Sequence, residues 1–168
     1  MGSFFYEIYK MIQSFLPILP KNPKVLILGT MPGVASLSHQ QYYAHPRNHF
    51  WKIMAFLYNS ENIILDYEAK KSLLHQNKIA LWDVLEFCER KGSLDIDIKN
   101  PIPHDIEKLL NENPTIQKII FNGKESDKLF KKHFTRHEHI SYHVVPSTSP
   151  ANTMKFETKL ALWQEALL

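Results

Sequence analysis

Short runs of apolar residues alternate along this chain with longer stretches in which apolar residues recur at helical spacing. Four of the runs predict buried strands, at residues 25–28, 79–82, 116–121 and 142–145. Helical spacing is found at residues 50–58, 67–76, 104–112, 124–133 and 156–167. Such alternation is typical of a parallel sheet with helices on both faces. We therefore expect an α/β fold, a three-layer α/β/α sandwich with a central four-stranded parallel sheet.

Two segments carry a different pattern. Apolar residues of Met1–Pro20 recur at helical spacing, but the segment lacks a basic start and has Glu7 inside its apolar stretch, unlike a signal peptide. Residues 88–103 are rich in turn signals, and loops of that length are often functional. No stretch approaches the roughly 20 apolar residues of a membrane span.

Composition narrows the class of protein. A chain of 168 residues, 44% hydrophobic and 22% charged, predicts one packed domain over residues 1–168. The net charge of +3 favours a polyanionic partner only mildly, because many ordinary domains carry a similar excess. Cys88 is the only cysteine, which excludes an internal disulfide and a multi-thiolate metal site. We expect a monomer in the reducing cytoplasm, with neither a metal nor another cofactor.

The segment after the first predicted strand carries the strongest chemical signal. The turn Gly29-Thr30-Met31-Pro32-Gly33 alone would be an ordinary strand-to-helix connection. Residues 40–51, QQYYAHPRNHFW, then bring amides, aromatic rings, a guanidinium and imidazoles together. These groups suit a pocket that stacks a base and binds its phosphate backbone. Because ligands bind beyond the carboxyl ends of parallel strands, residues 29–48, Asp83, Asn122 and 147–152 should meet at one site.

These residues carry a resemblance to a known family. Residues 29–33 followed by 40–51 resemble the first signature region of hypoxanthine-DNA glycosylases, a branch of the uracil-DNA glycosylase superfamily. The stretch YAHPRNHFWK is also similar to mismatch-specific uracil glycosylases, and weaker similarity covers residues 80–95 and 147–152. The resemblance implies the strand order 2-1-3-4. It also implies a hydrolase that removes a deaminated base, hypoxanthine and possibly uracil, from DNA in base excision repair.

The chemistry of base excision explains why these residue types occur together. A base inside duplex DNA must be flipped out before its N-glycosidic bond can be reached, which requires a stacking surface and phosphate anchors. The resemblance makes Tyr43 the stacking surface, beside Gly29, Thr30 and Met31 in the base pocket. The alternative is that Tyr43 is an aromatic residue packed in the core.

Asn48 is the predicted catalytic residue. Cleavage passes through an oxocarbenium-like sugar, so positioned dipoles and a positioned water matter more than a strong nucleophile. In much of the superfamily an Asp or Asn in the turn after the first strand holds this water, but residues 29–33 contain neither. The hypoxanthine branch implies Asn48, of Pro46-Arg47-Asn48, in its place. The alternative is an N-cap for the helix that begins near Phe50, and both roles are compatible.

The other strand ends supply the remaining candidates. A carboxylate at Asp83 would accept a hydrogen bond from a purine N–H, whereas Asp83 and Asn122 are alternatively turn or capping residues. The resemblance implies that the loop of residues 147–152 grips phosphates flanking the flipped nucleotide. Many family members have a histidine early in this loop; here Val145-Pro146 precedes Ser147, and His45 is the nearest substitute. The predicted DNA-binding residues are Arg47, Ser147, Thr148, Ser149 and Asn152.

Two other classes of protein fit part of this pattern. A single-strand or RNA-binding module would also use aromatic rings beside basic groups, and a nucleotide-metabolising α/β hydrolase would share the fold. A nucleotide-metabolising hydrolase would be expected to have a Gly-rich phosphate-binding loop, and this sequence contains none. The lysines at 124, 128, 131 and 132 could form a basic helix face for DNA or a merely solvated one. Lys52 is not obviously desolvated, so we expect a monofunctional glycosylase without lyase activity.

Overall fold

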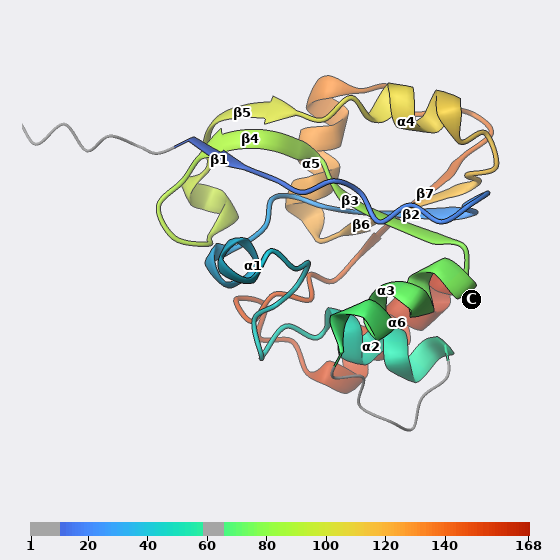
Figure 1. Cartoon of the computed structure of the whole chain (residues 1–168), viewed down its shortest axis with the longest axis horizontal. Coiled ribbons are helices and arrows are strands. Elements are labelled where there is room, and N and C mark those ends of the chain that lie inside the picture. Colours follow the sequence, from blue (N-terminus) through green and yellow to red (C-terminus); the bar gives the residue numbers. More distant parts are fainter. Residues whose placement is uncertain (1–10, 59–65) are drawn as a thin grey trace, which may run out of the picture.

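A four-stranded parallel sheet lies at the centre of the computed structural model, which describes residues 11–58 and 66–168 (Figure 1). The strands pair in the order β3-β2-β6-β7. Counted along the chain, this is the predicted order 2-1-3-4, so the predicted fold is confirmed. The strands are β2 Val25–Gly29, β3 Ile79–Asp83, β6 Lys118–Asn122 and β7 Ser141–Val145.

Helices cover both faces of this sheet (Figure 1). Side chains of β2 alternate between two buried clusters: Ile27 packs in one with Phe50 and Trp163, whereas Leu26 and Leu28 belong to the other. No helix of the described residues is long and apolar enough to cross a membrane. One face carries α2 Phe50–Tyr58, α3 Tyr67–Gln76 and α6 Phe156–Leu167, the other carries α4 Ile106–Glu112 and α5 Lys124–His133, and α1 Val34–His39 follows β2.

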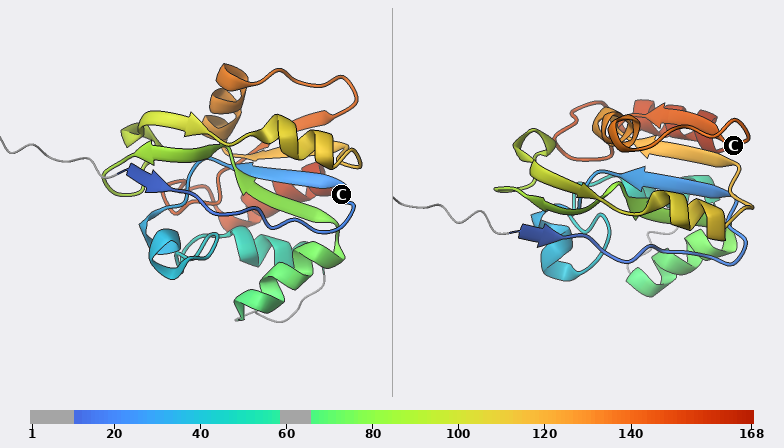
Figure 2. Two further views of the ribbon diagram at one scale, coloured as in Figure 1. Left: turned by 45° about the horizontal axis from the view of Figure 1, so that its top comes forward. Right: turned by 90° about the horizontal axis from the view of Figure 1, so that it is seen from above.

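A second, antiparallel sheet departs from the sequence prediction. It has the order β1-β4-β5 and is built from Met11–Gln13, Leu85–Glu89 and Lys99–Pro103. β4 continues from β3 and carries this sheet away from the parallel one (Figure 2). The segment 88–103, predicted as a long turn-rich loop, is therefore irregular mainly around the short 3₁₀ helix η1 Asp95–Asp97. Helical spacing over residues 1–20 was misleading at residues 11–13, which form a strand, and residues 1–10 lie outside the described part.

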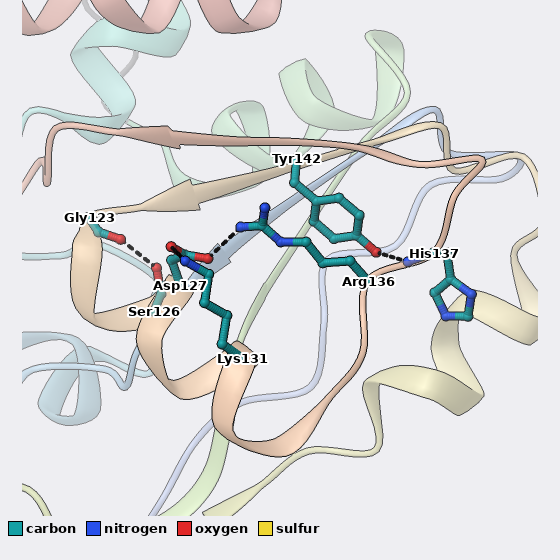
Figure 3. A network of polar contacts seen from close by, with 7 residues as sticks. All are labelled: Gly123, Ser126, Asp127, Lys131, Arg136, His137 and Tyr142. Atoms are coloured by element: carbon teal, nitrogen blue, oxygen red, sulfur yellow. Dashed lines mark hydrogen bonds and ion pairs between the residues drawn. The ribbon is translucent and has the colours of Figure 1, made fainter.

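Ion pairs within α5 account for part of its basic face. Asp127, almost buried, accepts a hydrogen bond from Arg136 Nη2 at 2.8 Å and pairs with Lys131 Nζ at 3.0 Å (Figure 3). Arg136 also lies over the ring of Tyr142 on β7, and Lys128 pairs with Glu125. An exposed pair such as Lys128 with Glu125 contributes little stability. Together these contacts favour the interpretation of this face as a solvated surface that is tied to β7.

Candidate active site at the carboxyl ends of the strands

A cavity of about 720 Å³ opens beyond the carboxyl ends of the four parallel strands. Strand-end segments that are far apart in the sequence contribute its walls, as expected for a parallel α/β sheet. Every residue that the sequence marks as catalytic, substrate-binding or DNA-binding lines this one cavity, while the role of each stays a prediction. These residues are Gly29, Thr30, Met31, Tyr43, His45, Arg47, Asn48, Asp83, Asn122, Ser147, Thr148, Ser149 and Asn152.

Gly29 lies in the cavity wall, at a position where no side chain would fit. A Cβ at this position would lie 2.5 Å from Asp83 Oδ1 and 2.8 Å from the Tyr43 hydroxyl. Both distances are shorter than van der Waals contact, so the last residue of β2 must be a glycine for the carboxyl and the phenol to reach this point. The strand end therefore brings together one acidic and one hydroxyl group from separate segments.

Asp83 is a buried carboxyl at the end of β3. Its Oδ2 accepts a hydrogen bond from Ser14 Oγ at 3.2 Å. Burial raises the pKa of Asp83 to about 7, with the charge of Asp95 acting in the same direction and the Ser14 hydrogen bond and Arg90 acting against it. The group therefore changes charge close to neutral pH. A carboxyl with such a pKa in a cavity is a typical functional residue.

Tyr43 is held in an unusual backbone conformation. Its φ of 53° lies in the left-handed region, which is uncommon for a residue with a large side chain. The ring packs against Phe50, with 4.3 Å between the ring centroids and 31° between the planes. Its buried hydroxyl makes no hydrogen bond of good geometry within residues 11–58 and 66–168, although the Asn122 amide acts on it and opposes the rise in its pKa that burial causes. Tyr43 is thus both packed against the core and part of the cavity, which combines the two alternatives drawn from the sequence.

The segment 45–48 forms a turn closed by the hydrogen bond from Asn48 N to His45 O at 2.9 Å. The side-chain Oδ1 of Asn48 accepts from Phe50 N at 2.9 Å, so Asn48 supports the start of α2. This contact agrees with the capping alternative and leaves the second lone pair of Oδ1 and the amide Nδ2 for the cavity. His45 Nδ1 accepts from Arg47 N at 3.1 Å, which places the proton of the neutral ring on Nε2.

The side-chain amide of Asn122 is hydrogen-bonded to a residue of the loop after β7. Its Nδ2 donates to Thr148 Oγ1 at 3.0 Å, and its Oδ1 accepts from Thr148 N at 2.9 Å. Thr148 is fully buried. The amide therefore fastens the loop to the end of β6, which is a positioning role. Base recognition by Asn122 would have to use the remaining hydrogen and lone pair of the same amide.

Hydrogen bonds to backbone carbonyls hold the loop of residues 147–152 in place. Lys159, on α6, has no exposed surface and donates from Nζ to Asn152 O at 2.8 Å and Ser149 O at 3.4 Å. Burial lowers the pKa of this lysine. The indole of Trp163 donates to Pro146 O at 2.9 Å, and His49 N donates to Thr148 O at 3.1 Å. The loop is preorganised, so little ordering is needed when it binds a ligand.

The fold and this cavity agree with a comparison of the chain with protein families. Residues 16–167 match the profile described as the Uracil DNA glycosylase superfamily. The chain belongs to this superfamily. It is accordingly a DNA glycosylase, an enzyme that acts on DNA.

Two curated relatives within the superfamily are similar over nearly their whole length. A hypoxanthine DNA glycosylase from Methanosarcina barkeri is 31% identical over 154 residues, which are 92% of this chain and 96% of the relative. A hypoxanthine DNA glycosylase from Methanosarcina acetivorans is 31% identical over 152 residues, 90% of this chain and 95% of the relative. The solution NMR structure of a protein from Methanosarcina acetivorans, proposed to be a uracil DNA glycosylase, superposes with a TM-score of 0.76 at 29% identity, covering 94% and 99% of the two chains.

Several residues that support or line the cavity of this superfamily member were missed from sequence. Arg90, almost fully buried, donates from its guanidinium to Pro32 O and from Nε to Gly92 O at 2.9 Å, so it clamps the turn after β2 to the segment after β4. Lys159 likewise donates hydrogen bonds to backbone carbonyls, and no sequence pattern predicts such bonds. Leu94 and Ile96 also line the cavity. Two aliphatic residues in a segment rich in turns were an available signal for them.

Proposed function

We propose that this enzyme is a monofunctional glycosylase that flips a deaminated base out of DNA and hydrolyses its N-glycosidic bond, with hypoxanthine as the principal substrate and uracil as a second one. The observation that carries the proposal is the pair of groups against Gly29. Asp83 offers an acceptor, and the buried Tyr43 hydroxyl makes no hydrogen bond of good geometry in the described part of the chain. Buried polar groups are normally hydrogen-bonded, so an unpartnered one beside a cavity indicates a ligand atom.

This pair suits the edge that deamination creates. Hypoxanthine and uracil each present a ring N–H next to a carbonyl, so the N–H donates to Asp83 and the carbonyl accepts from Tyr43. Adenine and cytosine present an unprotonated ring nitrogen next to an amino group, which reverses both positions. A cavity of about 720 Å³ admits a purine nucleoside. The two relatives named hypoxanthine DNA glycosylase support the purine as the principal substrate.

The reaction needs few groups once the nucleotide is in the cavity. The bond between the sugar C1′ and the base nitrogen breaks, water adds its oxygen to C1′, and the departing base takes a proton. Asn48 orients the water and stabilises the sugar cation through its amide dipole, and His45 Nε2–H lies in the cavity wall as a donor. Arg47 and the loop of residues 147–152 bind the flanking phosphates.

The positions of the lysines support a hydrolytic rather than a lyase reaction. Lys52 Nζ lies 4.0 Å from the centroid of the Phe156 ring, and Lys159 Nζ is held by two carbonyls. Neither lysine is among the cavity-lining residues. We expect the enzyme to act as a monomer, since one chain supplies every group named above. We also expect it to act in the reducing cytoplasm, with which a single cysteine, Cys88, is consistent.

One assay tests the proposal. The purified protein is incubated with duplex oligonucleotides that carry hypoxanthine, uracil, adenine or cytosine at one position, with and without subsequent alkali. Hypoxanthine should be released fastest, and strand scission should require alkali. A protein that binds these duplexes without releasing any base would be a binding module, and scission without alkali would indicate a lyase.

Replacing Gly29 by alanine should damage both the fold and the activity. The new Cβ would force Asp83 and Tyr43 apart, and overpacking of this kind costs about 1–3 kcal/mol. We expect a lower melting temperature and a slower single-turnover release of hypoxanthine. Gly33→Ala is the matched control in the same turn, because its nearest atom would be the flexible Ser93 Oγ at 3.2 Å. Parental behaviour of Gly29→Ala would show that the strand end tolerates a side chain.

A further inference from the structure

Residues 11–18 run antiparallel to the stretch of chain in which β3 passes into β4. β1 lies beside β4 in this arrangement (Figure 2). Beyond β1, Ser14 N donates to Glu86 O at 2.8 Å, and Ile18 and Leu81 exchange two backbone hydrogen bonds of 2.9 Å. Ser14 is therefore fixed on both sides, next to the end of β3.

Two aromatic side chains brace the same segment. The indole of Trp82 donates to Phe15 O at 2.9 Å, and the hydroxyl of the buried Tyr42 donates to Leu16 O at 2.9 Å. Both bonds follow Ser14 directly in the chain. The position of the Ser14 hydroxyl is thus set by the fold before any substrate arrives, which is what a residue that supports a binding site requires.

The two oxygens of the Asp83 carboxyl have different surroundings. Oδ1 lies against Gly29 beside the Tyr43 hydroxyl, whereas Oδ2 accepts the hydrogen bond from Ser14 Oγ at 3.2 Å. The torsion that turns a carboxyl group is soft, so a hydrogen bond to one oxygen fixes the direction of the other. Asp83 lines the cavity and Ser14 does not, so Ser14 can act on a substrate only through this carboxyl.

The other charged and titratable groups around Asp83 come from separate elements. Burial raises the pKa of Asp83, and the Ser14 hydrogen bond opposes this rise more strongly than Arg90, which follows β4, while Asp95 of η1 adds to it. Burial also raises the pKa values of the phenols of Tyr42 and Tyr43, so both stay neutral at physiological pH. The Ser14 hydroxyl is therefore the main group that favours the charged carboxylate.

We propose that Ser14 is a positioning residue for base selection, because its hydroxyl holds Asp83 Oδ2 and leaves Oδ1 as the oxygen that meets the base. The proposal rests on the proposed function, in which Asp83 accepts the ring N–H of hypoxanthine. With Oδ2 held by a donor, Oδ1 accepts a hydrogen bond when the carboxyl is charged and carries the proton when the carboxyl is neutral. Ser14 thus turns the charge state of Asp83 into a difference at the cavity surface.

The first test follows the carboxyl itself and does not depend on base release. The protein is labelled with ¹³C at the aspartate carboxyl carbons, and the NMR signal of Asp83 is assigned by its absence from Asp83→Asn. Ser14→Ala should raise the midpoint of the Asp83 titration by about one pH unit, because a hydrogen bond to a charged group is lost. Ser14→Thr keeps a hydroxyl and should restore the parental midpoint.

Ser141→Ala is the matched control for the loss of a serine hydroxyl. Ser141 begins β7 at the opposite end of the sheet, where its Oγ donates to Gln117 O at 3.4 Å outside the cavity lining. This variant should leave both the Asp83 midpoint and the rate of base release unchanged.

The second test measures the single-turnover release of hypoxanthine from a duplex between pH 5 and 9. The parental rate should rise with pH through about 7, as Asp83 becomes an acceptor. In Ser14→Ala the rise should move up by about one pH unit, which lowers the charged fraction, and hence the rate, at pH 7 by about fivefold. In an Asp83→Ala background the same substitution should change nothing further, because Ser14 acts only through the carboxyl.

Two results would overturn the role of Ser14. One is an Asp83 midpoint that stays in place in Ser14→Ala; combined with a lower melting temperature, it would make Ser14 a structural residue of the segment 11–18. The other is equal slowing by Ser14→Ala with and without the Asp83 carboxyl. A parent that releases no base, although its Asp83 midpoint moves in Ser14→Ala, would instead refute the proposed function and support the control of Asp83 by Ser14.

Discussion

Asn48→Ala should slow the single-turnover release of hypoxanthine by about 10²- to 10³-fold, the scale on which one preorganised electrostatic donor acts in other enzymes. The residue lies in the cavity wall, and residues 29–33 provide no other carboxylate or amide at the end of β2. Its carbonyl is oriented by the hydrogen bond to Phe50 N, so the amide dipole is fixed before the substrate arrives. Affinity for a hypoxanthine duplex should change much less, because phosphate contacts carry most of it.

The capping bond predicts a separate loss in the same variant. Removing the Asn48 side chain frees Phe50 N–H, which should cost about 1 kcal/mol of stability. Asn48→Ser separates the two effects, because a serine hydroxyl can accept from the amide two residues ahead but does not extend as far into the cavity. We expect this variant to regain most of the melting temperature without regaining the rate.

The measurements are the melting temperature and the single-turnover rate on the same preparations. If capping were the whole role, Asn48→Ser would work at the parental rate, and folded Asn48→Ala would do nearly as well. That outcome would remove Asn48 from the chemistry and direct attention to His45 and the loop of residues 147–152.

The parallel sheet was predictable because three of its strands, β2, β3 and β6, are buried on both faces. Runs such as Val25–Leu28 and Ile79–Trp82 are continuous apolar segments, which sequence patterns identify well. The rule that ligands bind beyond the carboxyl ends of such strands then brought distant residues to one cavity. The position of each candidate followed from this rule, whereas its contacts did not.

The antiparallel sheet was missed because its strands resemble turns in sequence. β5 contains Pro101 and Pro103, which an edge strand tolerates and a central strand does not. β4, LEFCE, is short and alternates, but it follows β3 after a single residue and so looked like the beginning of a loop. This sheet matters for function, since the segment between its strands β4 and β5 contains Arg90 and brings Leu94 and Ile96 to the cavity.

Buried charged residues were the other feature that could not be predicted from the sequence. Lys159 and Arg90 bind mainly backbone carbonyls, whose positions depend on the finished fold, so neither residue has a partner that the sequence could reveal. Lysine and arginine are rarely fully buried, so nothing in the sequence indicated that these two residues would be. Thr148 and Asn122 show the same limit, because their mutual bonds join segments 26 residues apart.

Asp83 should make stability depend on pH in a way that an amide would not. Its folded pKa of about 7 lies above the ordinary 3.8, so the folded state keeps the proton to higher pH than the unfolded state does. The loss of stability caused by burying the charged carboxylate of Asp83 is absent below about pH 4, grows as the pH rises to 7 and is complete above it. At about 1.36 kcal/mol per pH unit it reaches the order of 4 kcal/mol. The Asp83→Asn variant should therefore melt at a higher temperature than the parent, and the difference should grow between about pH 4 and pH 7 and then level off.

The same titration should govern base selection. Above pH 7 the carboxylate only accepts hydrogen bonds, so it favours the N–H of hypoxanthine and repels the bare ring nitrogen of adenine; below pH 7 the protonated form can donate to adenine as well. The preference of the parent for hypoxanthine over adenine should therefore rise with pH through about 7, and Asp83→Asn should remove this rise. Asp83→Ala should lose about 10- to 100-fold in hypoxanthine release, the range of a hydrogen bond to a charged group, while it keeps most duplex affinity. Single-turnover rates between pH 5 and 9, paired with duplex binding, measure both effects; a uniform loss on all bases in Asp83→Ala, accompanied by a lower melting temperature, would make Asp83 a structural residue of the β3 end.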